Sequence, residues 1–103
     1  MIKYGVFISR PANNDIREIV NHIRLDKPKA ATNFKKQILS KIKSLQYFPL
    51  RGKKVTDKFY WGSENDYEVF LGEYLIVYRV IEKTVSVNRV LHGRMETKDI
   101  SLL

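Results

Sequence analysis

Apolar residues occupy every second position in residues 2–9, which predicts a strand with one buried face. Ser9 and Pro11 then suit the start of a helix, because serine caps the first turn and proline fits its first positions. Isoleucine and valine follow at a spacing of three or four residues up to about Leu25. The pair Lys27-Pro28 ends this first helix, since the residue before a proline disfavours helical backbone.

A second helix is predicted from about Pro28 to a point before Phe48-Pro49. The break between the helices is short, so they should form an antiparallel hairpin. Arg51-Gly52 follows the second helix as a turn signal. The buried stripe of this helix is expected to consist of Ala31, Phe34, Ile38, Ile42 and Leu45.

The second half of the chain is predicted to form strands. Residues 50–65 are the least periodic stretch and are interpreted as a loop with room for one short strand. Gly72-Glu73 suits a two-residue hairpin turn, and Glu82-Lys83 provides the next turn. The middle strand is apolar on both faces, as expected of a strand with neighbours on both sides. The three predicted strands are Tyr67–Leu71, Tyr74–Ile81 and Thr84–His92.

The predicted element order is therefore β-α-α-β-β-β. Consecutive hairpins make the last three strands antiparallel, and the helix pair must cover one face of the sheet. We expect an α+β fold in which a helical hairpin packs on one face of a largely antiparallel four-stranded sheet. The length of 103 residues suits a single domain spanning residues 1–103.

Composition narrows the class of protein. Hydrophobic residues make up 44% of the chain, enough for a folded core. There is no cysteine, which excludes a disulfide scaffold and thiolate chemistry. No apolar run approaches the ~18 residues of a membrane-spanning helix, and the N-terminus lacks the apolar core of a signal peptide. We expect a soluble, cytoplasmic protein with no membrane partner.

The formal net charge of +8 is concentrated in the middle of the chain. Residues 27–58 contain ten basic residues and one acidic residue, whereas residues 59–103 carry a net charge of −2. Most of these lysines fall between the apolar positions of the second helix and so on its outer face. Such a field attracts polyanions, either nucleic acid or an acidic protein. The alternative is a solvated face that only keeps the protein soluble.

Few residues suggest catalysis. His92 lies between Arg89 and Arg94 at the end of the last predicted strand, where it could be a general acid or base, or a structural histidine bonded to backbone. His22, in the first helix, is interpreted as structural or exposed. No metal site or cofactor is expected, because two distant histidines and scattered glycines provide neither a ligand cluster nor a phosphate-binding loop.

Arginines in the predicted strands form a second set of candidates. An arginine on an apolar face either pairs with a carboxylate or binds a phosphate or a partner, and both alternatives stay open here. Tyr60 and Trp61, next to Lys58, could stack bases or close the edge of the core. Simple alternation places Arg79 on one face with Leu75, Val77 and Ile81, and Arg89 on one face with Val85, Val87 and Leu91.

These segments together resemble the RelE/ParE superfamily of bacterial type II toxins, and in particular its ParE-like branch. The likeness covers nearly the whole chain, and no single segment is specific alone. The most specific parts are residues 72–79 (GEYLIVYR) and residues 89–95 (RVLHGRM). The other parts are Ala12, Asp15-Ile16 and Ile19 in the first helix, the stripe of the second helix, Phe48-Pro49 and Gly52.

The resemblance implies a toxin that is neutralised by an acidic, toxin-wrapping antitoxin, with operator DNA bound only through the antitoxin. RelE-like members cut mRNA on the ribosome, whereas ParE-like members inhibit DNA gyrase. Where RelE-like toxins often have arginines, this chain has Leu75 and Met95, and its tail, Glu96–Leu103, has no tyrosine or histidine. We therefore expect a gyrase inhibitor rather than an enzyme. The alternatives are a ribosome-dependent endoribonuclease that uses His92 and Arg94, and a purely regulatory partner of the antitoxin.

Two sets of site residues follow from the resemblance and the charge pattern. The target-binding set is expected around the last strands, and the antitoxin-binding set in the cationic middle of the chain. The target-binding set consists of Arg79, Arg89, His92, Arg94 and Met95. The antitoxin-binding set consists of Lys35, Lys36, Lys41, Lys43, Lys53 and Lys54.

Overall fold

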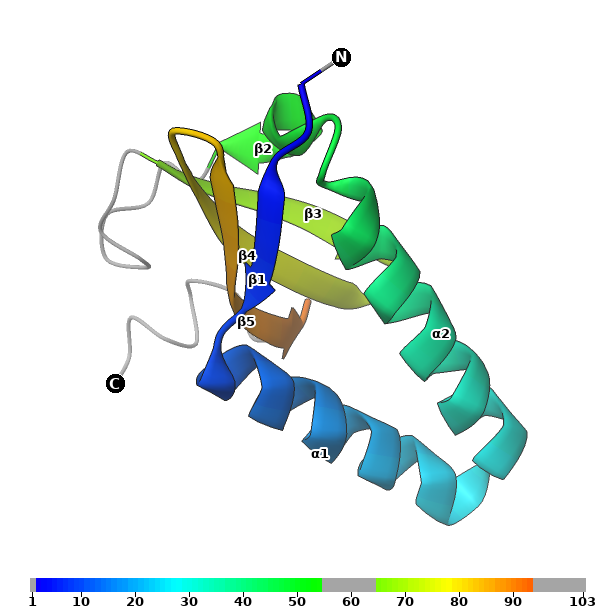
Figure 1. The fold of residues 1–103 in the computed structure, drawn as a ribbon. Coiled ribbons are helices and arrows are strands. Elements are labelled where there is room, and N and C mark those ends of the chain that lie inside the picture. Colours follow the sequence, from blue (N-terminus) through cyan, green and yellow to red (C-terminus); the bar gives the residue numbers. More distant parts are fainter. Residues whose placement is uncertain (1, 55–64, 94–103) are drawn as a thin grey trace, which may run out of the picture.

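The computed structural model describes residues 2–54 and 65–93 of the chain (Figure 1). Its order of helices and strands confirms the predicted β-α-α-β-β-β arrangement, with two short additions between the second helix and the last three strands. The elements are β1 (Gly5–Ile8), α1 (Arg10–Asp26), α2 (Pro28–Ser44), the 3-10 helix η1 (Pro49–Arg51), β2 (Lys53–Lys54), β3 (Asp66–Leu71), β4 (Tyr74–Ile81) and β5 (Thr84–His92).

The strands form one sheet in the order β1-β5-β4-β3-β2. β1 pairs with β5 in parallel, and every other pair is antiparallel. The largely antiparallel sheet of four predicted strands is thus confirmed. The loop that had room for one short strand contributes the two-residue β2, which adds a fifth strand at the edge.

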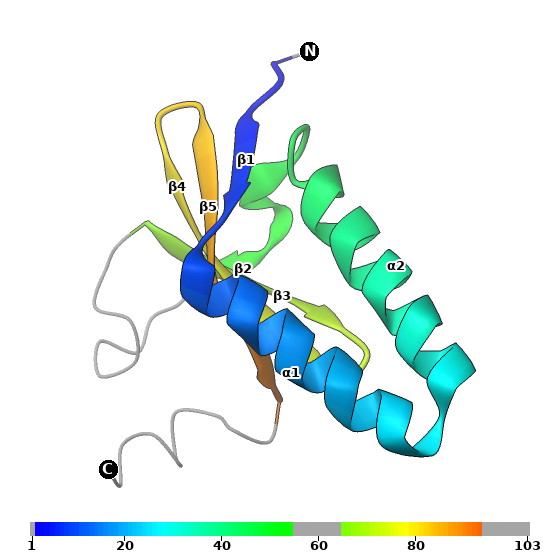
Figure 2. The same cartoon turned by 60° about the horizontal axis from the view of Figure 1, so that its bottom comes forward.

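Both helices cover the same face of the sheet, as the hairpin arrangement predicts (Figure 2). The five stripe residues predicted for α2 are all buried, from Ala31 at its start to Leu45 just after its end. They meet the residues of the sheet that point toward the helices. The buried core cluster consists of Ala12, Ile16, Val20, Ala31, Phe34, Ile38, Ile42, Leu45, Ile76, Tyr78, Val85, Val87 and Val90.

Local signals at the helix ends act as predicted. The Ser9 hydroxyl accepts a hydrogen bond from the Ala12 backbone N–H at 3.2 Å and so caps the first turn of α1. Lys27 is the single residue between the helices, and Pro28 is the first residue of α2. This tight connection turns the chain back on itself and lets both helices pack on one face of the sheet.

An irregularity in β5 corrects one predicted face. Val77 pairs with Arg89, but the next residue, Tyr78, pairs with Val87, so Asn88 is an extra residue in β5. Such a β-bulge shifts the alternation of side chains by one position. Val90 therefore joins Val87 in the core cluster. The prediction that Arg89 shares a face with Val85 and Val87 is wrong for this reason, whereas Leu91, which follows the bulge, does lie on the face of Arg89 as predicted.

The buried tyrosine of β4 anchors the connection that follows α2. The Tyr78 hydroxyl donates a hydrogen bond to the Pro49 carbonyl oxygen at 2.6 Å. Gly52 lies so close that an added Cβ would collide with that hydroxyl and lie 2.7 Å from the Glu68 carbonyl oxygen. A residue without a side chain is therefore required at position 52. Burial raises the pKa of Tyr78 above its ordinary value of 10.0, although a hydrogen bond with the Gly52 backbone and the charge of Arg51 oppose the shift.

The variant Tyr78→Phe should lose about 1–2 kcal/mol of unfolding free energy near neutral pH, because the buried Pro49 carbonyl loses its donor. The folded-state pKa is raised, so this contribution is present below pH 10 and is lost as the pH rises further. Urea unfolding of both proteins between pH 8 and about 11.5 measures this difference. A parallel Tyr47→Phe variant, which changes a residue that is 43% exposed, is the control. A wild-type advantage that stays constant above pH 10 would contradict the assignment.

Candidate functional site

Arg79, a predicted target-binding residue, is engaged by a buried carboxylate. It lies in β4 directly opposite Asp66 of β3. Its Nε donates to Asp66 Oδ1 at 2.9 Å, and the Asp66 side chain is completely buried while 38% of the Arg79 side chain is exposed. The hydrogen bond to Asp66 raises the pKa of Arg79 above its ordinary value, against the opposing effect of burial. Arg79 therefore compensates a buried negative charge.

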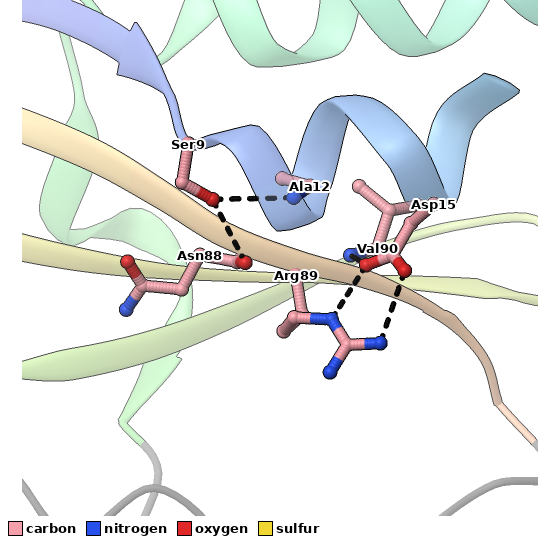
Figure 3. Close-up of polar contacts among 6 residues, drawn as sticks. All are labelled: Ser9, Ala12, Asp15, Asn88, Arg89 and Val90. Carbon is pink, nitrogen blue, oxygen red and sulfur yellow. Dashed lines mark hydrogen bonds and ion pairs between the residues drawn. The ribbon is translucent and has the colours of Figure 1, made fainter.

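Arg89 is engaged in a second ion pair, which links β5 to α1 (Figure 3). Its Nε and one terminal nitrogen donate to the two oxygens of Asp15 at 2.7 Å and 3.0 Å, a bidentate arrangement. Asp15 Oδ2 also accepts the backbone N–H of Val90 at 2.9 Å. The hydrogen bond to Asp15 raises the pKa of Arg89. One carboxylate thus binds both a side chain and the edge of a strand.

Ser9 completes this junction between helix and strand. Its hydroxyl donates to the Asn88 carbonyl oxygen at 3.0 Å while accepting from the Ala12 N–H (Figure 3). β1 stops pairing with β5 at Val87, where the Ser9 backbone N–H donates to the Val87 carbonyl at 2.9 Å. Beyond that point, Ser9 and Asp15 supply the polar contacts that a neighbouring strand would otherwise make.

Of the two alternatives left open for the arginines, pairing with a carboxylate is confirmed for both. A role in binding a target remains a prediction. The carboxylate partners Asp15 and Asp66 were not predicted from the sequence. Asp66 lies at the start of a strand, and Asp15 lies beside the apolar stripe of α1. An acidic residue next to predicted core positions was therefore the sequence signal that could have identified these partners.

His92 lies at the end of β5, beside the turn that joins β3 and β4. Its ring meets the Tyr74 ring edge-on, with centroids 5.2 Å apart, and its Nε2 is 3.3 Å from Glu73 Oε2. Tyr74 in turn packs against Phe34 of α2 at 4.8 Å. His92 is therefore part of an aromatic contact that ties the end of the sheet to α2, and its proposed role in catalysis or target binding stays a prediction.

Several predicted residues lie outside the residues that the structure describes. Arg94 and Met95 of the target-binding set are among them, as is the aromatic and basic cluster of Lys58, Tyr60 and Trp61. Lys54 belongs to β2 through its backbone, and its side chain is not described. The roles expected for these residues remain predictions.

The predicted antitoxin-binding lysines are divided between different surfaces. Lys35 lines a groove between α1 and α2, whose floor includes Ile16 and Val20. Lys36 and Lys41 line a separate groove on the other side of α2, together with Arg51. Lys43 and Lys53 are exposed. The six residues therefore do not line one common groove. Lys35 and Lys36, although adjacent in α2, line two different grooves.

Residues 2–54 and 65–93 contain neither a membrane-spanning helix nor a cluster of metal-ligating side chains. No helix in these ranges is both long enough and apolar enough to cross a lipid bilayer. No three histidine or acidic side chains there lie close enough together to hold a metal ion.

The variant Asp15→Ala should lower the unfolding free energy by about 2–3 kcal/mol, because Arg89 and the Val90 N–H lose their acceptor together. Asp15→Asn should cost less, since an amide oxygen can still accept from Val90. Asn14→Ala, at the neighbouring exposed position, is the control. Chemical denaturation gives all three values. The junction would be unimportant if Asp15→Ala were no more destabilising than Asn14→Ala.

Three solved structures from toxin–antitoxin systems share this architecture. A chain of the chromosomal ParDE system of P. aeruginosa superposes with a TM-score of 0.72 at 18% identity, covering 87% of this chain and 96% of that one. A chain of the RelBE2 toxin–antitoxin complex of Mycobacterium tuberculosis gives 0.64 at 21% identity, with 88% and 99% covered. A mutant of E. coli toxin RelE in the free state gives 0.59 at 18% identity, with 98% and 93% covered.

These identities establish the fold alone. A comparison with curated proteins finds no match. The family model described as "ParE toxin of type II toxin-antitoxin system, parDE" matches residues 6–97, from β1 to beyond the end of β5. Since that match spans most of the chain, the protein belongs to the ParE toxin family of type II toxin–antitoxin systems.

Proposed function

We propose that this protein inhibits DNA gyrase by stabilising its cleaved-DNA complex, and that a cognate antitoxin neutralises it. The observation that carries the proposal is the match to the ParE family over residues 6–97. Inhibition of this kind requires a surface that binds gyrase and no bond-breaking chemistry in the toxin. The protein acts in the cytoplasm, where gyrase is found, and reaches operator DNA only through the antitoxin.

The arrangement of the sheet favours binding over RNA cleavage. Attack by a ribose 2′-hydroxyl needs a base, an acid and cations that hold the phosphate. Leu75, at a position where RelE-like toxins often have an arginine, is apolar and 3% exposed. Arg79 and Arg89 each hold a carboxylate, which would compete with a phosphate for the guanidinium. These features make the ribonuclease the weaker candidate.

The exposed part of the sheet face opposite the helices is the proposed gyrase-binding surface, since Leu75, Val77 and Leu91 on that face are buried. Strand register places Arg79 and Arg89 on it, since their sequence neighbours Tyr78 and Val90 point into the core. The same register places Phe7, Phe70 and Ile81 on this face, with 62%, 51% and 50% of each residue exposed. Large exposed apolar residues that share a face are typical of protein-binding surfaces.

The test combines purified protein, gyrase, relaxed plasmid and ATP, with and without a detergent that traps cleaved DNA. We expect loss of supercoiling and toxin-dependent linear DNA. Phe70→Ala should weaken inhibition about tenfold if its exposed ring contacts gyrase. Leu25→Ala, which truncates an 87% exposed leucine at the end of α1, is the matched control.

Expression of the same protein in cells without an antitoxin should arrest growth, and this arrest establishes that the toxin is active. Gyrase that remains unaffected by an active toxin would overturn the proposal. Cleavage of translated mRNA at codon boundaries, lost in His92→Ala or Arg94→Ala, would then establish the ribonuclease. Harmless expression of the bare gene would point to a purely regulatory protein.

A further inference from the structure

Four large apolar residues are exposed together where the chain leaves α2. Ile2, Phe48 and Leu50 are each 57% exposed, and Tyr47 is 43% exposed. They line one groove with Tyr4, Pro49 and Arg51, between the start of β1 and the 3-10 helix η1. A cluster of this kind is costly to leave in water and usually marks a docking surface.

A cationic groove lies next to this apolar one. Lys36, Lys41 and Arg51 line it with the polar residues of α2 and with Leu71 from the end of β3. None of its described lining residues is acidic. Arg51 lines both grooves, so the two grooves adjoin at this residue. We call the pair of adjoining grooves, with Lys36, Lys41, Arg51, Phe48, Leu50 and Ile2 as its marker residues, the α2–η1 channel.

The backbone that carries the channel is held from within the core. The Tyr78 hydroxyl binds the Pro49 carbonyl, which fixes the segment between Phe48 and Leu50. Arg51 donates a hydrogen bond from its guanidinium to the Ser44 hydroxyl near the end of α2. Tyr4 donates its backbone N–H to the Gln46 carbonyl at 2.7 Å, which ties β1 to the same region. The channel is thus preorganised, which reduces the entropy cost of binding.

We infer that the α2–η1 channel is the docking surface for an acidic amphipathic segment of the antitoxin, an inference that rests on the proposed function. The segment would place apolar side chains against Phe48, Leu50 and Ile2, and carboxylates against Lys36, Lys41 and Arg51. Charge complementarity selects an acidic occupant. The groove mixes the aliphatic Ile2 and Leu50 with the aromatic Phe48, which suits the varied apolar side chains of a polypeptide, whereas bases would gain little from its aliphatic part.

This surface is distinct from the proposed gyrase-binding face. Its marker residues belong to α2, η1 and the start of the chain, whereas Arg79, Phe70 and Ile81 belong to the opposite face of the sheet. The residues that an antitoxin segment would cover in the channel are therefore different from the exposed residues of the sheet face.

The absence of cysteine allows a direct footprint. Single-cysteine variants Leu50→Cys and Lys36→Cys report on the two halves of the channel, and Leu25→Cys is an exposed control on α1. Each is labelled with a maleimide alone and in complex with the co-purified antitoxin. We expect labelling at both channel positions to slow several-fold in the complex and labelling at Leu25→Cys to be unchanged. Full labelling at both channel positions in an intact complex would overturn the inference.

Charge reversal at two adjacent residues gives an independent test. Lys36 lines the channel, whereas Lys35 lines the groove between α1 and α2. Lys36→Glu should weaken antitoxin binding about tenfold, and Lys35→Glu should weaken it much less. Equal losses would mean that the antitoxin responds to net charge alone, and a loss confined to Lys35→Glu would place it in the other groove. Either result overturns the inference.

Two results separate this inference from the proposed function. A footprint outside the channel with gyrase still inhibited refutes the docking site alone. Gyrase that is unaffected while the channel is protected refutes the target alone. Protection of the channel by a single-stranded oligonucleotide, with none by the antitoxin, would show a nucleic-acid surface and overturn the inference.

Discussion

The structure depends on how the edge of β5 is completed where β1 ends. β1 pairs with β5 only as far as Val87, and a strand edge left beyond that point would expose unpaired backbone groups. At this edge the Ser9 hydroxyl donates to the Asn88 carbonyl and the Asp15 carboxylate accepts from the Val90 N–H, which replaces the hydrogen bonds that a neighbouring strand would have made. The same contacts fix the direction of α1, and through the short connection at Lys27 they also fix α2 over the sheet (Figure 1).

The ion pairs of Arg79 and Arg89 limit what these two arginines can bind. Arg89 is part of the junction between α1 and β5, and Arg79 balances the buried charge of Asp66. A substitution at either position changes stability as well as any binding, so loss of growth arrest alone would not identify a target contact. Exposed residues that form no such ion pair, such as Phe70 on the sheet and Leu50 on η1, are better reporters of binding. The proposed gyrase-binding face and the α2–η1 channel can therefore be tested separately.

The sequence predicted most of the fold because its local signals agree with one another. The alternation before Ser9, the break at Pro28 and the glycine turn at Gly72 each act over a few residues, and the structure uses all three.

Features that depend on tertiary contacts were not predicted. The extra residue Asn88 cannot be recognised in an apolar strand pattern, and it reversed the predicted face of Arg89. The partners Asp15 and Asp66 lie 74 and 13 residues from their arginines. The channel likewise combines residues from separate segments of the chain, so it could not be predicted from the sequence. Composition showed only that lysines are concentrated in the middle of the chain.

The central physical claim is that the Asp15 carboxylate attaches the helices to the edge of β5. Hydrogen exchange at the Val90 backbone amide tests it most directly, because that N–H has Asp15 as its acceptor. In the wild-type protein, the Val90 amide should exchange as slowly as that of Ile76 in the middle of the sheet. In Asp15→Ala, its exchange should accelerate far more than that of Ile76. Rapid exchange at Val90 in the wild-type protein, or no selective change on substitution, would contradict the account.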